Sequence, residues 1–283
     1  MLRSMLSGVS GLRTHQIRMD VVGNNIANVN TTAFKSSRVT FQDVYSQTLK
    51  PAAGANNGLG GVNPMQVGLG TSLATIEVLH DRGSTERTDR PLDLAIAGDG
   101  FFVVSDGAQT YYTRAGNFGL DANGYLVNAN GYVVQGVNWD PTDPTTQQPP
   151  SDAASLQAIQ IPNFTNYSDL SINKYGIIQA IDTTTGDIVE LGQIAVAVVP
   201  NPQGLHQEGK ALYSESKNSG VPVIGGAGDN SSGFIDAGAL EMSNVDLAKE
   251  FTDMIITQRG FQANSRIITT SDEMLQELLS LKR

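Results

Sequence analysis

The side chains that could support catalysis or bind a metal ion are scattered along this 283-residue chain. The three histidines, His15, His80 and His206, lie in different segments, and none has a ligand partner at metal-binding spacing. The chain has no cysteine, which excludes disulfides and thiolate chemistry. Asp121-Ala-Asn-Gly124 resembles the start of a calcium loop, but no later acidic ligand follows at the required spacing. We therefore predict no catalytic residue, no metal site and no cofactor. The sequence alone leaves open one alternative, a pair of carboxylates that hydrolyses glycosides.

Charge and hydropathy narrow the classes of partner. The chain has 28 acidic and 18 basic residues, a net charge of −10, which argues against binding to nucleic acid or to an anionic membrane. Its longest apolar run, residues 194–199, is too short to span a bilayer. The first eight residues interrupt any apolar stretch with Ser and Gly, so we expect no cleaved signal peptide and no membrane insertion.

Both ends of the chain carry the pattern of long amphipathic helices. No proline occurs before Pro51 or after Pro222, and the first helix is predicted to end near Asn28. At the second helix, Ser243 or Asn244 is the predicted cap. On the first helix, apolar residues at alternating spacings of three and four form a seam, interrupted at Gln16 and Gly23: Leu2, Met5, Val9, Leu12, Met19 and Ile26. On the second helix, apolar residues recur at every seventh position, at Leu247, Met254, Phe261, Ile268 and Leu275, and Phe251 joins the second line of the seam.

These two apolar seams must be covered by something. They could pack on the chain's own β-rich middle, or pair with each other and with helices of other copies. Polar residues recur about once per heptad in the second seam, at Gln258, Ser265 and Asp272. Polar residues in a seam set register at a cost in stability, which favours pairing between helices.

The middle of the chain reads as turns and short strands. Residues 50–71 are rich in Gly and Asn, and a tandem Asn-Gly repeat at residues 121–134 predicts successive hairpins. Residues 140–150 have the composition of an exposed loop. We predict an α+β fold with a mostly antiparallel sheet. The expected domains are a helical domain of residues 1–35 with 243–283, an extended connecting loop at 36–71 and a β-rich outer domain at 72–242.

The two ends also resemble the signature sequences of bacterial flagellar axial proteins. The motifs are Asp20-Val-Val-Gly-Asn-Asn-Ile-Ala-Asn-Val-Asn-Thr-Thr-Ala-Phe-Lys35 and Gln258-Arg-Gly-Phe-Gln-Ala-Asn264. Inside the chain, Arg90-Pro-Leu-Asp-Leu-Ala-Ile-Ala-Gly-Asp-Gly-Phe-Phe102 is similar to the hook and distal-rod branch of that family. The signature positions are Asn24, Asn25, Asn28, Asn30, Phe34, Lys35, Gln258, Arg259 and Asn264.

One position departs from the family pattern. Ala33 stands where the family usually has Gly before Phe-Lys. If the backbone there takes a positive φ, alanine costs about 1 kcal/mol.

The resemblance implies a function. It indicates a structural subunit of the flagellar hook that assembles into a helical tube, a flexible joint that transmits motor torque. It also implies export by the flagellar type III apparatus, an extracellular place in the flagellum, and contacts with rod, hook-cap and hook–filament junction proteins. The distal rod protein is the alternative. A secreted β-domain carbohydrate-binding protein or hydrolase, with the helices as an oligomerisation device, is the hypothesis from another class.

Overall fold

In a computed structural model, the chain folds into two compact units. The structure describes residues 2–54, 60–139, 148–150, 155–162, 166–183, 186–229 and 231–281, apart from the side chain of Leu2. The helical unit comprises Met1–Asn28, Ser36–Leu79 and Val245–Arg283, and the β unit comprises Val29–Lys35 and His80–Asn244. Two terminal helices and mostly antiparallel strands between them confirm the α+β prediction.

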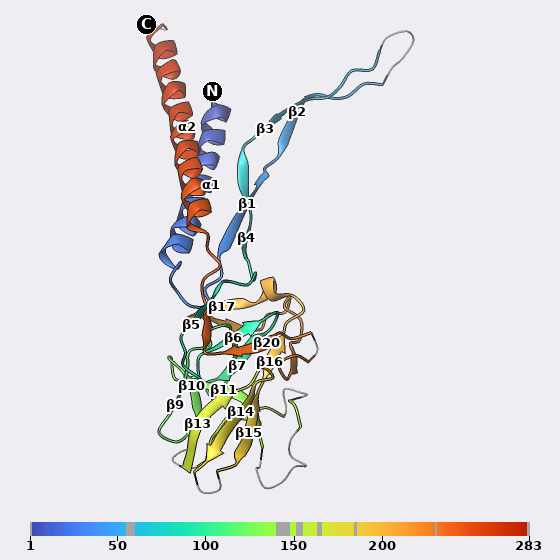
Figure 1. Cartoon of the computed structure of the whole chain (residues 1–283). Helices are drawn as coiled ribbons and strands as arrows, with labels where there is room; N and C mark the ends of the chain where they lie inside the picture. Colours follow the sequence, from blue (N-terminus) through green and yellow to red (C-terminus); the bar gives the residue numbers. More distant parts are fainter. Residues whose placement is uncertain are drawn as a thin grey trace. The chain divides into compact units, whose positions relative to one another are not determined.

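The helical unit is built on two helices from opposite ends of the chain. Helix α1 spans Leu2–Ala27 and α2 spans Leu247–Ser280, and they lie side by side with opposite directions (Figure 1). The predicted cap of α2 was wrong. Asp246 is the cap, and its carboxylate accepts hydrogen bonds from the backbone N–H groups of Ala248 and Lys249. A carboxylate suits this position because it also meets the positive end of the helix dipole.

Small and polar residues line the contact between the two helices. On α1 the contacts come from Ser4, Gly8, Gly11, His15, Arg18 and Asn25. On α2 they come from Ser271, Ile268, Asn264, Gly260, Asp253 and Glu250. Both sets repeat at heptad spacing, and each is shifted by one position from most of the predicted apolar seam. We call this set of residues the inner seam.

The glycines of the inner seam allow the helices to approach closely. A methyl group on Gly11 would lie 2.5 Å from the Asn264 side-chain nitrogen, and one on Gly260 would lie 2.7 Å from the His15 ring. At one end of the pair, Ser4 and Ser271 have their hydroxyl oxygens 3.4 Å apart. Further along, Arg18 donates to Asp253 over 2.9 Å.

Two antiparallel strand pairs complete the helical unit. Strands β1 (Ser37–Asp43) and β4 (Thr71–Val78) pair together, as do β2 (Ser46–Lys50) and β3 (Met65–Gly68), and α1 packs on β1 and β4. Residues 36–71, expected to be an extended connection, therefore contain three strands. The sequence did not predict these strands, because most side chains of β2 and β3 are exposed and part of the segment is rich in Gly and Asn. The predicted division into inner and outer domains of an assembly stays a prediction.

The β unit contains a branched antiparallel sheet. Among the described residues, thirteen strands join in this sheet. The pairs β20–β6 and β21–β5 form two separate two-stranded sheets. The strands are β5 (Thr85–Arg87), β6 (Leu94–Ala97), β7 (Phe101–Ser105), β8 (Thr110–Thr113), β9 (Phe118–Leu120), β10 (Leu126–Asn128), β11 (Val133–Asn138), β12 (Gln157–Ala158), β13 (Tyr167–Ile172), β14 (Ile177–Asp182), β15 (Ile188–Ile194), β16 (Val196–Val198), β17 (His206–Gly209), β18 (Leu212–Ser214), β19 (Val223–Gly225), β20 (Phe234–Ala237) and β21 (Ala239–Glu241).

Strand β7 separates two apolar cores in the β unit. Phe102 and Val104 belong to the larger core, and Phe101 and Val103 belong to the smaller one. Successive side chains of a strand point to opposite faces, so a strand with both faces buried reads as a continuous apolar run. The run from Phe101 to Val104 has this character.

The tandem repeat forms the predicted hairpins. β10 pairs with β9 on one side and with β11 on the other. The turn glycines Gly124 and Gly131 have φ of 79° and 83°, a conformation that glycine adopts without steric cost. Of the predicted exposed loop at 140–150, residues 140–147 lie outside the described residues.

The glycines of α1 give a matched test of close helix packing. We expect Gly23→Ala to raise the free energy of unfolding of the helical unit by about 1 kcal/mol, because alanine favours helix and its methyl group meets no atom within 4 Å. Gly11→Ala makes the same propensity change but displaces Asn264, so we expect lower stability. Thermal unfolding followed by circular dichroism measures both, and equal stabilisation by the two variants would contradict the packing described.

Candidate assembly surface

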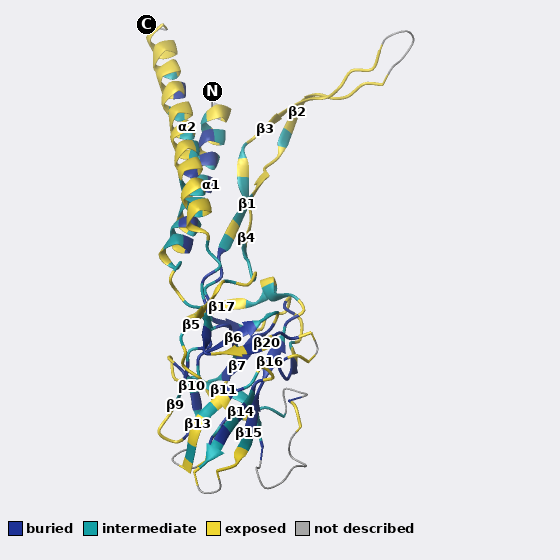
Figure 2. Ribbon diagram, in the orientation of Figure 1, coloured by how far each residue is buried: buried dark blue, intermediate teal, exposed yellow. Residues whose placement is uncertain are grey.

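The surface of the helix pair outside the inner seam carries many exposed apolar side chains. Figure 2 shows exposed residues along most of α2. Phe251 is 50% exposed, Ile255 53% and Ile256 52%. The complete set on the two helices, which we call the outer apolar surface, is Leu6, Val9, Leu247, Phe251, Ile255, Ile256, Phe261, Ile267, Met274, Leu278 and Leu279. Exposed apolar area of this extent marks an interaction surface.

The predicted seam residues lie beside the inner seam or on the outer apolar surface. Val9, Leu247, Phe251 and Phe261 are exposed. The half-buried members are Met5, Leu12, Met19, Ile26, Met254, Ile268 and Leu275. Ile268 belongs to both the predicted seam and the inner seam, since a methyl group on Gly8 would lie 3.2 Å from its side chain. Sequence reasoning missed the rest of the inner seam because those residues are small, polar or charged and are not of one chemical kind.

Asn25 ties three elements of the helical unit together. Its amide oxygen accepts from the Ser37 N–H at 3.0 Å, and its amide nitrogen donates to the Ser37 carbonyl at 2.9 Å. The same nitrogen donates to Glu250 in the first turn of α2 at 3.2 Å. The side chain is buried, so these bonds fix the end of α1 to the start of β1 and to α2.

The other signature residues have different surroundings. Asn264 packs against Gly11, and Asn28 donates to the Asn24 carbonyl and side-chain oxygens. Phe34 is half-buried. The exposed signature residues are Asn24, Asn30, Gln258 and Arg259.

Lys35 takes part in a buried charge cluster in the β unit. Its ammonium group donates to Glu241 at 2.5 Å and to the Asp81 carbonyl at 2.8 Å, and both charged side chains are fully buried. Arg114 approaches the second oxygen of Glu241 at 3.4 Å, and the Gly83 N–H donates to the first. Burial lowers the pKa of Lys35, and the Glu241 carboxylate opposes this shift.

The same cluster joins the two segments at the ends of the β unit. Ala33 donates its backbone N–H to the Glu241 carbonyl at 2.8 Å, and Asn244 donates to the Phe34 carbonyl at 3.4 Å. Ala33, at the position where the family usually has glycine, has φ of 58°, so the condition under which alanine is costly there is met. Sequence reasoning missed Glu241, Arg114 and Asp81, because nothing local distinguishes them from surface charges.

His80 lies next to this cluster. Its ring packs edge-on against Phe101 and Tyr213, with ring centroids 5.6 and 5.2 Å away. Burial, followed by the charges of Lys35 and Arg114, lowers the pKa of His80 to about 4. The imidazole is therefore neutral at pH 7 and resists protonation in the folded chain.

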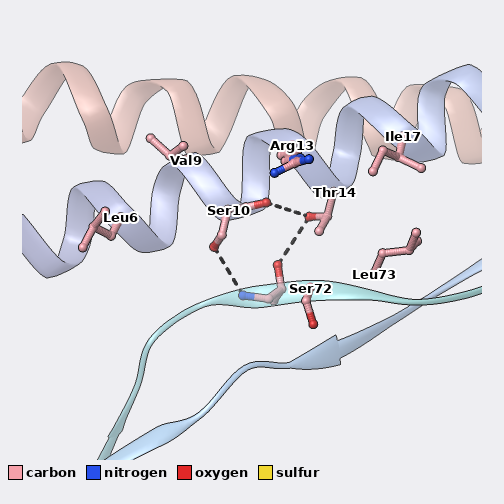
Figure 3. Close-up of a pocket in the computed structure, with 9 residues that line it drawn as sticks. Leu6, Val9, Ser10, Arg13, Thr14, Ile17, Ser72 and Leu73 are labelled. Carbon is pink, nitrogen blue, oxygen red and sulfur yellow. Dashed lines mark hydrogen bonds between the residues drawn. The ribbon is translucent and has the colours of Figure 1, made fainter.

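A groove runs between α1 and β4 within the helical unit (Figure 3). Its volume is about 550 Å³. Ser10 accepts a hydrogen bond from the Thr71 N–H at 3.3 Å, and the hydroxyls of Thr14 and Thr71 lie 3.3 Å apart, which holds β4 on α1. The groove is lined by Leu6, Val9, Ser10, Arg13, Thr14, Ile17, Thr71, Ser72 and Leu73.

Neither a metal site nor a membrane helix is found in the described part of the chain. No three acidic or histidine side chains there gather closely enough to hold a metal ion. Neither described helix combines the length and the apolar character that crossing a membrane requires. What the geometry offers is a surface for association.

Three family models match successive parts of the chain. Residues 5–35 match "Flagella basal body rod protein", residues 95–180 match "Flagellar hook protein FlgE/F/G D1 domain", and residues 236–281 match "Flagellar basal body rod FlgEFG protein C-terminal". The first contains most of α1, and the last contains all of α2. The matched order is that of the two helices and the β unit between them.

Relatives match over the whole length. The flagellar basal-body rod protein FlgG of Bacillus subtilis is 48% identical over 284 residues, covering 100% of both chains. The chain belongs to the flagellar hook and basal-body rod protein family. The flagellar hook protein FlgE of Borreliella burgdorferi is 30% identical, again covering 100% of both chains. That alignment runs over 441 positions, so the hook protein carries segments that have no counterpart here.

Removing the buried ammonium group tests the charge cluster. We expect Lys35→Met to lower the free energy of unfolding by about 3–5 kcal/mol, because Glu241 is left buried with less compensation. Lys35→Met combined with Glu241→Gln should recover part of the loss. Arg38→Met is the control, since its ion pair with Glu77 is exposed on the arginine side and costs less than about 1 kcal/mol to remove. Denaturant unfolding compares the three, and equal effects of Lys35→Met and Arg38→Met would refute the cluster's role.

The depressed pKa of His80 predicts a loss of stability in acid. Between pH 6.5 and about 4, the unfolded chain takes up a proton at His80 that the folded chain does not. The free energy of unfolding is therefore full above pH 6.5 and falls by about 3 kcal/mol as the pH drops to about 4. His80→Phe keeps a ring beside Phe101 and Tyr213 but cannot be protonated. We expect a smaller fall in the variant when unfolding is measured from pH 7 to pH 4, and parallel curves would disprove the assignment.

Proposed function

We propose that this chain is a structural subunit of the bacterial flagellar hook that assembles with many copies of itself into a helical tube. The observation that supports this most is the helix pair, whose inner seam is small and polar while its outer surface is apolar. A single copy leaves that apolar surface in water, at a cost of about 25 cal/mol per Å². Neighbouring copies of the same helices offer a matching surface to cover it.

The distal rod of the basal body is the second candidate position. It is favoured by the 48% identity to a protein named as a basal-body rod protein, in a match that covers 100% of both chains. The hook is favoured by full-length matches to hook proteins of Borreliella burgdorferi and Treponema pallidum. Both positions use the terminal helices for assembly.

The proposal extends to location and partners. The subunit is exported through the flagellar type III apparatus and functions outside the cell, next to rod, hook-cap and hook–filament junction proteins. It carries out no catalysis and needs no cofactor, and its net charge of −10 does not suit nucleic acid. Membership of a family of flagellar axial proteins favours this over the carbohydrate-binding or hydrolase hypothesis.

A charge placed on the outer apolar surface should block assembly. We expect Ile256→Glu to leave the monomer folded, because the side chain is half exposed, but to prevent tubes, because the new carboxylate would be buried unpaired between copies. Gln262→Glu is the matched control on an exposed polar position of α2 and should still assemble. Sedimentation and negative-stain electron microscopy report both. Normal tubes from Ile256→Glu would count against the proposed surface.

Deleting the gene separates hook from rod. Electron microscopy of cell-envelope preparations should show complete rods that end without a hook if the hook assignment holds. Rods that stop before their distal part would assign the chain to the distal rod. Intact flagella on motile cells would overturn both assignments.

A further inference from the structure

The end of α2 extends past the start of α1. Ser271 lies level with Ser4, and α2 continues for nine more residues, whereas α1 begins only two residues before Ser4. At about 1.5 Å per residue, roughly 10 Å of α2 projects beyond its partner helix. The projecting turns are apolar and exposed: Leu278 is 51% exposed and Leu279 69%.

The α1–β4 groove also presents exposed apolar side chains. Leu6 and Val9 reach its edge while being 67% and 54% exposed, so the chain itself does not fill it. Its volume of about 550 Å³ can take several apolar side chains. One copy of the chain therefore presents both an unfilled apolar groove and an uncovered apolar helix end.

The charges at the two places are opposite. Arg13 is exposed at the groove. Glu273 and Glu277 are exposed near the end of α2, five positions and one position before Leu278. Opposite charges at the rim of an apolar contact fix its register and orientation.

We propose that the projecting end of α2 in one copy inserts into the α1–β4 groove of a second copy, with Leu278 in the groove and Glu277 near Arg13. This rests on the proposed self-assembly and names the contact that carries it. The groove and the helix end are different surfaces, so each added copy leaves one of each unfilled. Such a heterologous contact produces an open helical polymer when its rotation does not close into a ring, which is the arrangement that the proposed tube requires.

The contact also sets a spacing. Within one chain, Asn264 lies level with Gly11 in the middle of the groove-lining part of α1. Leu278 is fourteen positions further along α2, which corresponds to about 20 Å at the helical rise. Copies joined in this way are therefore displaced by about 20 Å along the helix axes.

Cysteine cross-linking tests the contact, because the natural chain has no cysteine background. Val9→Cys and Leu278→Cys are made in separate chains, which are mixed, assembled and mildly oxidised. We expect a disulfide-linked dimer from this mixture. The same mixture with Gln262→Cys in place of Leu278→Cys is the control, at an exposed polar position of α2, and should lose that dimer. A link within one chain is excluded, since Val9 and Leu278 are separated by about 15 Å along the helix pair.

A charge exchange provides an independent measurement in the full chain. Arg13→Glu should abolish assembly by placing like charges together, and Arg13→Glu combined with Glu277→Arg should restore it. Tubes that form without the Val9–Leu278 link, or a charge exchange without rescue, would overturn this contact while leaving self-assembly intact. A natural chain that never polymerises would overturn the proposed function and this contact with it.

Discussion

The structure depends on one constraint: two helices from opposite ends of the chain must meet. Ser4 and Ser271 are separated by 267 positions, and closing such a loop carries an entropic cost that local contacts cannot offset. The β unit contributes by holding its own two end segments together. Lys35 and Glu241, 206 positions apart, form a buried ion pair, and Ala33 bonds to the Glu241 backbone. The segments leading to both helices therefore start from one fixed place in that unit.

The contact between the helices explains why the pair suits a polymer. Glycines and polar side chains let the helices approach closely and fix their register, but they bury little apolar surface. Register comes from specific bonds such as Arg18 to Asp253 and Asn25 to Glu250. Several large hydrophobic side chains, such as Phe251, Ile255 and Ile256, are exposed, and contacts with other copies can bury them. Stability of the helices is thereby linked to assembly, since association stabilises whichever state it binds.

Much of the fold follows from local sequence, and the site does not. Heptad spacing predicts both helices, and Asn-Gly turns predict the β9–β10–β11 hairpins, because each signal acts within a few residues. The phase of the helix contact could not be predicted: apolar residues usually mark the buried face, whereas here the intrachain contact uses Gly8, Gly11 and Gly260. Likewise Asp246 rather than an earlier residue caps α2, a difference of two or three positions that propensity does not resolve.

The buried cluster lies beyond sequence reasoning for a different reason. Lys35 stands out in the sequence only as a signature position of the family. Its partner Glu241 is far away in the chain, among ordinary strand residues. Nothing in composition or spacing pairs them. At Ala33 the glycine usual in the family raised a positive φ as a condition, and the backbone meets that condition with φ of 58°.

A reconstruction of the assembled polymer by electron cryo-microscopy tests the central claim most directly. The account predicts that α1 and α2 keep their inner seam within each copy, while Phe251, Ile255 and Ile256 lie buried between neighbouring copies. Helices that leave these side chains facing water throughout the polymer, with subunits joined only through the β unit, would contradict it.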